Sequence, residues 1–273
     1  MDEILGFHPH IDVIATMGGL AVAYRYLTTR IARQVLPPGT AGATRRQQAQ
    51  FYGGVALMFL VSTWPIHDIG EQSLFTFHMV EHLVIALIGA PLLLLGIPRW
   101  LAEFLLSKPR QLQFARAVSH PLVGFTFFNL TLAGLHWPQI VDLMVNVSWI
   151  HFAVHATLFT SAILMWMPVI SPHPEIPRLR PPGAMMYLFA QSLVPTIPSA
   201  FLIFGSEPMY QHYANAVRLW DWDPMMDQAI AGIIMKLGGG FLLWGVITVI
   251  FFRWYQQERR WDELEQRLRE PVQ

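Results

Sequence analysis

Seven long apolar segments constrain the fold of this chain more than any other feature of its sequence. Each is long enough to cross the hydrocarbon core of a bilayer as a helix, which takes about 20 mostly apolar residues. Charged residues make up only 13% of the 273 residues, about half the share that is usual in a soluble domain. We therefore predict an all-α polytopic membrane protein that forms one domain over residues 1–273. The seven predicted spans are residues 11–29, 49–66, 73–97, 121–137, 148–170, 184–205 and 227–252.

The composition excludes several functions. The formal net charge is zero, so nothing in the charge balance indicates nucleic-acid binding. The chain contains no cysteine, which excludes disulfides, thiolate metal sites and cysteine catalysis together. A transition metal would therefore be held by His, Met, Asp or Glu. The N-terminus lacks the basic region of a cleavable signal peptide, so we expect the first span to direct its own insertion.

The distribution of basic residues predicts the orientation. If the N-terminus is outside, 16 of the 18 Lys and Arg residues fall on the inner side, and Arg218 and Lys236 are the exceptions. Basic residues are concentrated in cytoplasmic loops, so we predict an external N-terminus and a cytoplasmic C-terminus. Residues 99–119 are predicted to form an interfacial helix, and residues 253–273 a short charged helical tail. Pro195 and Pro198 should kink the sixth span.

Two pairs of histidines are the strongest functional signal. His78 and His82 lie four residues apart in the third predicted span, and His151 and His155 have the same spacing in the fifth. This spacing places both rings of a pair on one face of a helix. Both spans begin on the outer side, so both pairs should lie at similar depth, with His136 at the outer end of the fourth span. Because ionisable side chains in a membrane span are costly, they indicate a functional site.

The rest of the outer side fits a metal-handling surface. Nine of the eleven histidines and ten of the eighteen acidic residues fall there. Imidazole binds copper, zinc, iron and nickel, and nearby thioethers such as Met79 favour cuprous copper. Glu81 and Lys236 have similar predicted depths and opposite charges, so we predict that they form an ion pair, since a buried charge without a partner is costly. Single histidines at span ends are interpreted as interfacial residues that bond to a carbonyl or to water, namely His8, His10, His67 and His212.

Several short motifs, taken together, carry a specific resemblance. Over roughly residues 50–250 the chain resembles the CtaG family of membrane proteins required for cytochrome c oxidase assembly. The motifs are His78-Met79-x-x-His82 with residues 90–96 after it, His136-Trp137-Pro138, the pair His151/His155 with Leu164-Met165-Trp166 and Pro168 after it, Tyr210-x-x-Tyr213-Ala214, and Asp227-Gln228-x-x-Ala231-Gly232-x-x-Met235.

This resemblance implies a seven-span protein of the bacterial cytoplasmic membrane that has no enzymatic activity. It would help to mature haem–copper oxidases at the stage of copper insertion, with oxidase subunits and copper-delivery proteins as partners within the lipid bilayer. An unrelated cysteine-dependent copper chaperone shares the family's name, and this cysteine-free chain does not resemble it. The family's ligand role would fall on His78, His82, His136, His151 and His155, and the further candidates are Asp227, Met79, Glu81 and Lys236.

Three alternatives remain open from the residues alone. The segment from His78 to His82 fits the pattern H-x-x-E-H, in which two histidines bind zinc and the glutamate acts as the general base of a metalloprotease. Paired histidines on two spans could instead hold haem in a b-type membrane cytochrome. The histidines of a scaffold protein that holds oxidase subunits would only pack against neighbouring helices.

Overall fold

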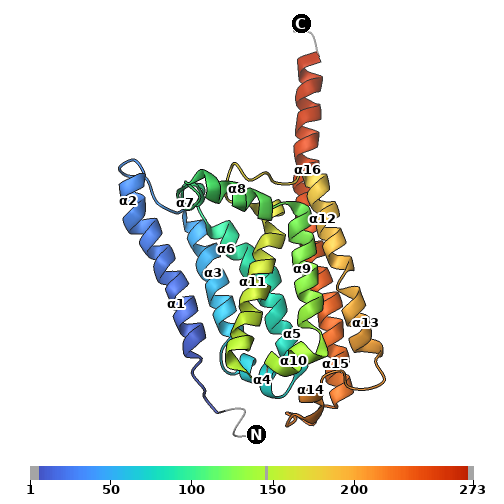
Figure 1. Cartoon of the computed structure of the whole chain (residues 1–273). Coiled ribbons are helices and arrows are strands. Elements are labelled where there is room, and N and C mark those ends of the chain that lie inside the picture. Colours follow the sequence, from blue (N-terminus) through green and yellow to red (C-terminus); the bar gives the residue numbers. More distant parts are fainter. Residues whose placement is uncertain (1–5, 145–146, 270–273) are drawn as a thin grey trace.

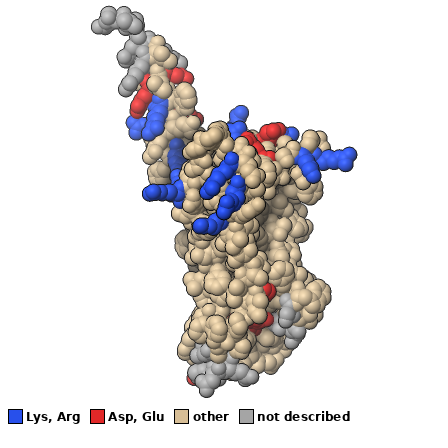
Figure 2. All heavy atoms as spheres, turned by 90° about the vertical axis from the view of Figure 1, so that its left-hand side faces the viewer, with Lys and Arg blue, Asp and Glu red and all other residues tan. Residues whose placement is uncertain are grey.

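The computed structural model describes residues 6–144 and 147–269, and every regular element in this part of the chain is a helix, as predicted. The chain runs back and forth between the two ends of an elongated bundle (Figure 1). Helices α2, α7 and α8 lie at one end, where Lys and Arg side chains gather (Figure 2). We call this the basic end. The opposite end, which carries α4, α10 and α14, is called the histidine end.

The helices follow one another with short connections, and three of them continue through a π-helical segment labelled η. The first elements are α1 (Ile11–Tyr26), η1 (Leu27–Ile31), α2 (Ala32–Val35), α3 (Arg45–Val61), α4 (Ile66–Gln72), α5 (Phe75–Leu83), η2 (Val84–Gly89), α6 (Ala90–Gly96), α7 (Arg99–Leu105) and α8 (Pro109–Val118). The remaining elements are α9 (Pro121–Leu135), α10 (Pro138–Met144), α11 (Ser148–Ile170), α12 (Pro181–Leu193), α13 (Thr196–Phe204), α14 (Gln211–Asn215), α15 (Pro224–Ile233), η3 (Ile234–Gly238) and α16 (Gly239–Arg269).

Four helical stretches in the described part are long and apolar enough to cross a membrane, and up to six are if each of two bent pairs counts as one span. The bent pairs are α3 with α4, at 44°, and α8 with α9, at 63°. The continuous helix from Ile11 to Val35, which contains the first predicted span, is not among them. The chain is therefore a helical membrane protein, while the count of seven spans and the orientation of its termini stay predictions.

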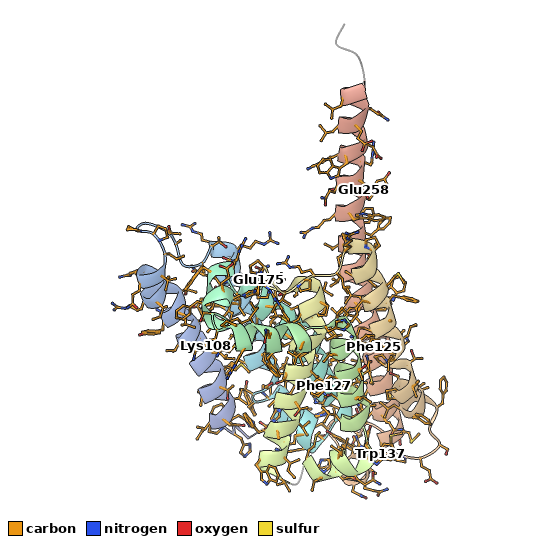
Figure 3. All side chains as sticks on the ribbon, turned by 45° about the horizontal axis from the view of Figure 1, so that its top comes forward. Lys108, Phe125, Phe127, Trp137, Glu175 and Glu258 are labelled. Carbon is orange, nitrogen blue, oxygen red and sulfur yellow. The ribbon has the colours of Figure 1, made fainter. Side chains whose placement is uncertain are left out.

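Two details of the helices confirm the sequence analysis. The helix in the sixth predicted span is interrupted between Leu193 and Thr196, where Pro195 lacks the N–H that would continue the helical hydrogen bonding. The predicted charged tail is helical, because α16 continues well past the bundle and its side chains there are exposed. Figure 3 shows Glu258 on this projecting part, and Trp137 near the opposite end.

The bundle is packed most tightly toward its basic end. The ring of Tyr24 on α1 stacks on Phe51 of α3, with centroids 3.9 Å apart, and its hydroxyl donates to the carbonyl of Gly96, 2.9 Å away. A Cβ atom added to Gly96 would lie 2.6 Å from the Cβ atom of Phe51, so only glycine allows this approach of α6 to α3. Leu94 and Trp166 are buried in the same apolar cluster. These contacts fix the halves of the helices that lie toward the basic end, and the histidines lie on the opposite halves.

Candidate metal centre

The helix that carries the first histidine pair begins at a buried carboxylate. Asp227 accepts hydrogen bonds from the backbone N–H groups of Phe75 and Thr76, at 2.8 and 2.9 Å, which are the first residues of α5. A negative charge at this position satisfies unpaired N–H groups and the helix dipole. Arg218 balances it with an ion pair of 3.0 Å. Both oxygens are thus engaged, and Asp227, proposed above as a further ligand, positions the helix that carries His78.

Three of the predicted ligands converge, as expected from the two pairs. The rings of His78 and His82 on α5 are 4.1 Å apart, and His155 of α11 lies 5.3 Å from His82 and 6.2 Å from His78. Each of these three residues offers a nitrogen atom that lies within 4.8 Å of the other two, and they are the one such group of three or more among the described residues. His78 is 3% exposed and His82 6%. The centre is therefore made from two helices and is shielded from solvent.

His151 joins this group through its neighbour on α11. The Nε2 atoms of His151 and His155 are 3.1 Å apart, a hydrogen bond that requires one of the two rings to carry a proton at Nε2. The Nδ1 atom of His151 lies 3.2 Å from a carboxylate oxygen of Glu71, and the Nδ1 atom of His155 lies 3.4 Å from one of Glu81. Protons at both Nδ1 atoms would instead break this hydrogen bond and free both Nε2 lone pairs, and in this structure Nδ1 of His151 and Oε1 of Glu81 have no hydrogen-bond partner with good geometry among the described residues. A carboxylate beside Nδ1 is the arrangement that orients a histidine toward a metal.

Glu81 lies at the centre of the buried polar network. Its side chain is 1% exposed, and its second oxygen lies 2.9 Å from Nδ1 of His67 on α4. One carboxylate therefore contacts two imidazoles from two different helices. Its Oε1 atom has no hydrogen-bond partner with good geometry among the described residues. Glu81 is thus held by histidines, where the sequence analysis expected a lysine.

The predicted ion pair between Glu81 and Lys236 is wrong. The ammonium group of Lys236 donates to the carbonyl of Ser192, at 3.1 Å, and to the hydroxyl of Thr196, at 2.5 Å. These two residues flank the interruption between α12 and α13. Similar depth in the membrane does not determine which way a side chain points around its helix, and Lys236 points to a different neighbour.

The other two predicted ligands lie beside the centre. The ring of His136 is 6.4 Å from that of His82, and its Nδ1 atom is 2.6 Å from the carbonyl of Leu132, so Nε2 is the nitrogen it can offer. Met79 is 1% exposed and packs in the apolar cluster around Phe75. Both line a cavity of about 50 Å³ that also reaches His82. His136 and Met79 are therefore neighbours of the three-histidine group and are not part of it.

Sequence reasoning missed a set of residues on and around α4. The ring of His67 lies 5.0 Å from that of His151, and its Nε2 atom is 3.5 Å from a carboxylate oxygen of Glu71. His10 lies next to it, with Nε2 3.0 Å from the carboxylate of Asp68. The interpretation of His10 and His67 as isolated interfacial residues is therefore wrong. The spacing of four between His67 and Glu71 was the available signal.

The segment before α15 closes the centre from the histidine end. Tyr213 of α14 is buried, and its hydroxyl donates to the carbonyl of Gly70 at 2.7 Å. Burial raises the pKa of Tyr213 well above its ordinary value, so the phenol stays neutral and remains a donor. His212 contacts the carbonyl of Glu71 at 2.7 Å, which matches the predicted bond from a single histidine to a backbone carbonyl. This segment therefore covers α4 and the start of α5.

The chemistry of the centre is that of neutral nitrogen ligands. The buried Nε2 atom of His82 has no hydrogen-bond partner among the described residues, although an unpaired buried polar atom is costly. A metal ion coordinated by imidazole would remove this cost. With nitrogen ligands and no thiolate, the donors suit copper and zinc and fit calcium and magnesium poorly.

Comparisons with known proteins identify the family of this chain. The family model described as "Cytochrome c oxidase caa3 assembly factor" matches residues 22–257, which include every histidine of the centre. Two curated relatives are an uncharacterized protein, Mb0105, of Mycobacterium bovis (strain ATCC BAA-935 / AF2122/97) and an uncharacterized protein, MT0111, of Mycobacterium tuberculosis (strain CDC 1551 / Oshkosh). Each is 26% identical over 248 residues, which cover 78% of this chain and 35% of the relative. The chain thus spans about a third of these relatives' length, and no solved structure matches it.

Proposed function

The chain belongs to the family of cytochrome c oxidase caa3 assembly factors, and we propose that it supplies copper to the oxidase from the centre formed by His78, His82 and His155. Copper is the cargo in this proposal and is handed on. The family indicates a role in assembly without catalysis of its own. The partners would be the oxidase subunits and the proteins that deliver copper to this chain.

The observation that carries the proposal is the convergence of the three histidines. Nitrogen atoms from His78, His82 and His155 lie within 4.8 Å of one another inside a membrane bundle. The buried Nε2 atom of His82 has no hydrogen-bond partner among the described residues, which costs free energy, and binding of a metal ion by this nitrogen would offset it. Imidazole ligands without thiolate suit copper that must later be released. The absence of cysteine from the whole chain leaves no softer ligand to compete.

The surrounding carboxylates would control how the histidines bind. Glu71 and Glu81 lie beside the Nδ1 atoms of His151 and His155, so they can hold the protons there and leave the Nε2 atoms for the metal. The proton in the hydrogen bond between the two Nε2 atoms would move to the Nδ1 atom of the same ring, beside its carboxylate, when copper binds. His151 would then be a fourth ligand, and His136 would be within reach after a small movement.

The positive-inside pattern supports placing this centre near the outer surface of the bacterial cytoplasmic membrane. Lys and Arg gather at the opposite end of the bundle (Figure 2). Copper would therefore be received and handed on at the outer side of the membrane.

The test is metal analysis of the purified protein, together with the activity of the oxidase in cells that depend on it. We expect wild-type protein to bind copper, and His155→Ala to lose copper and oxidase activity while remaining in the membrane. His8→Ala is the matched control, since His8 is exposed and distant in sequence from the centre. Copper binding and oxidase assembly by the triple variant of His78, His82 and His155 would contradict the proposal. A Soret band, or zinc with proteolytic activity, would support the haem or protease alternative.

A further inference from the structure

Helix α1 is most deeply buried toward one of its ends. Toward the basic end Tyr24 is 3% exposed and stacks on Phe51. Farther along α1, toward the histidine end, Gly18 and Gly19 have no neighbouring atom within 4 Å of an added Cβ atom. Figure 1 shows α1 at the edge of the bundle. Gly18 and Gly19 are exposed, and the partly buried residues of the same helix, Val13, Met17 and Leu20, line a space between α1 and the bundle.

This space is a cavity of about 200 Å³ that leads to the histidine centre. Helices α1 and α11 form its two side walls. Half of the lining residues are apolar, namely Val13, Met17 and Leu20 on α1, Met58 on α3, Ile85 on η2, and Phe152, Ala156 and Phe159 on α11. Its polar lining includes His67, Glu81, His151 and His155. The cavity thus connects the side of α1 with the imidazoles that Glu71 and Glu81 orient.

A polar contact holds α1 at the outer end of this cavity. His10, the residue before α1, has its Nε2 atom 3.0 Å from Oδ1 of Asp68 on α4. Asp68 is buried, and its other oxygen, Oδ2, has no hydrogen-bond partner among the described residues. The ring of Phe7 packs edge-on against Trp64, with centroids 5.8 Å apart. Helix α1 is therefore held at both ends, and between them Met17 and Leu20 are only partly buried against the apolar core.

We propose that this cavity is the exchange site where copper passes between the histidine centre and a membrane-embedded helix of a partner protein. This inference rests on the proposed function and adds the route by which copper would leave the histidine centre. The apolar lining fits a hydrophobic helix that carries a single soft ligand, an imidazole or a thioether. Met17 on α1 and Met58 on α3 also line the cavity, and their thioethers are ligands that cuprous copper accepts.

The transfer is a ligand exchange without a change of oxidation state. As a nitrogen or sulfur atom of the partner bonds to the copper ion, the bond from one His155 or His151 nitrogen breaks, and the freed nitrogen keeps its lone pair while the ring keeps its proton at Nδ1. The ion thereby stays coordinated throughout. A bare cation in an apolar interior would cost far more free energy. The exchange therefore needs space for an incoming ligand next to these two histidines, and the cavity provides it.

Filling the cavity tests the proposal. Ala156→Trp should block the exchange site, so the purified variant keeps the copper content of the wild type, while oxidase activity in membranes falls to that of cells lacking the protein. Ala153→Trp is the matched control, because Ala153 is exposed on the same helix and does not line the cavity. This control should retain both copper and activity.

The outcomes distinguish a failure of the exchange site from a failure of the proposed function. If the wild type binds no copper, the proposed function fails. If wild type and Ala156→Trp bind copper equally and support the oxidase equally, the exchange site is wrong while the proposed function stands. Val13→Trp fills the cavity from the opposite wall and replaces Ala156→Trp if that variant does not accumulate. Loss of copper by both filling variants would make the cavity part of the binding site itself and overturn its role in exchange.

Discussion

The two halves of the same membrane helices are built in opposite ways. At the histidine end, α5 and the start of α11 bury imidazoles and a glutamate, and several of their polar atoms have no hydrogen-bond partner among the described residues. Toward the basic end, α6 and the later part of α11 bury Leu94, Met165 and Trp166 in a continuous apolar cluster. The difference indicates that the apolar half provides stability, while the polar half gives up some stability, which fits the metal binding proposed above.

The junction between the halves has its own structure. The π-helical segment η2 begins immediately after α5, two residues beyond His82, and η3 interrupts the last long helix at Lys236. Such wider turns are rare in helices and often occur at functional sites. A π turn changes the register of the side chains that follow it. The continuous helix from α5 to α6 therefore carries histidines before η2 and buried leucines after it.

The largest effect should come from breaking the apolar half. Trp166 is 2% exposed, and its Nε1 atom donates to the carbonyl of Ala86 at 3.0 Å. We expect Trp166→Ala to lower the free energy of unfolding by about 3 kcal/mol, the lower end of the range for truncating a buried aromatic ring, because lipid reduces the hydrophobic part of the cost. Unfolding in detergent measures this. The copper content per folded molecule should not change.

The matched control for this change is Trp149→Ala. Trp149 lies near the start of the same helix and is 72% exposed, so its removal should affect stability little. A stable Trp166→Ala protein that had lost its copper would refute the division between the two halves.

A smaller effect should come from the polar half. Glu81→Gln preserves the shape of the side chain but removes the negative charge shared by His67 and His155. Replacing a carboxylate that orients a ligating histidine typically lowers metal affinity by about 10–100-fold, so we expect a loss of that size with copper still bound at saturation. Competition with a copper chelator measures the affinity. The free energy of unfolding should change less than in Trp166→Ala.

Glu103→Gln is the control for the charge, because Glu103 is exposed on α7 at the basic end. Unchanged copper affinity in Glu81→Gln would show that the carboxylate does not orient the histidines. Complete loss of folded protein would place Glu81 in the stabilising half and remove the contrast between the halves.

The sequence predicted the parts of the site that depend on helical periodicity. The spacing of four residues places His78 with His82, and His151 with His155, on single helix faces, and their common depth follows from where the two spans begin. The convergence of His155 with the first pair confirms this. The broken helix at Pro195 was predictable for the same reason, since proline acts locally.

The rest of the site depends on angles between helices, which periodicity does not give. The 44° bend between α3 and α4 brings the ring of His67 next to that of His151. Nothing in the local sequence specifies that angle. Asp227 accepts from a helix start more than 150 positions earlier in the chain. The sequence showed that both residues lie near the outer side, and it did not show which groups they contact.

The smallest predicted effect concerns Lys236 and Glu81, which lie near the junction between the two halves. Lys236 donates to Ser192 and Thr196, while Glu81 contacts His67 and His155, so the two charges share no partner. The changes in the free energy of unfolding caused by Lys236→Met and Glu81→Gln should therefore add within about 0.5 kcal/mol in the double variant. Copper affinity should follow Glu81→Gln alone, because Lys236 contacts neither the ligands nor their carboxylates. A double variant that is more stable than either single variant would instead mean that the two charges interact, and the polar half would then extend past η2 and η3 toward the basic end.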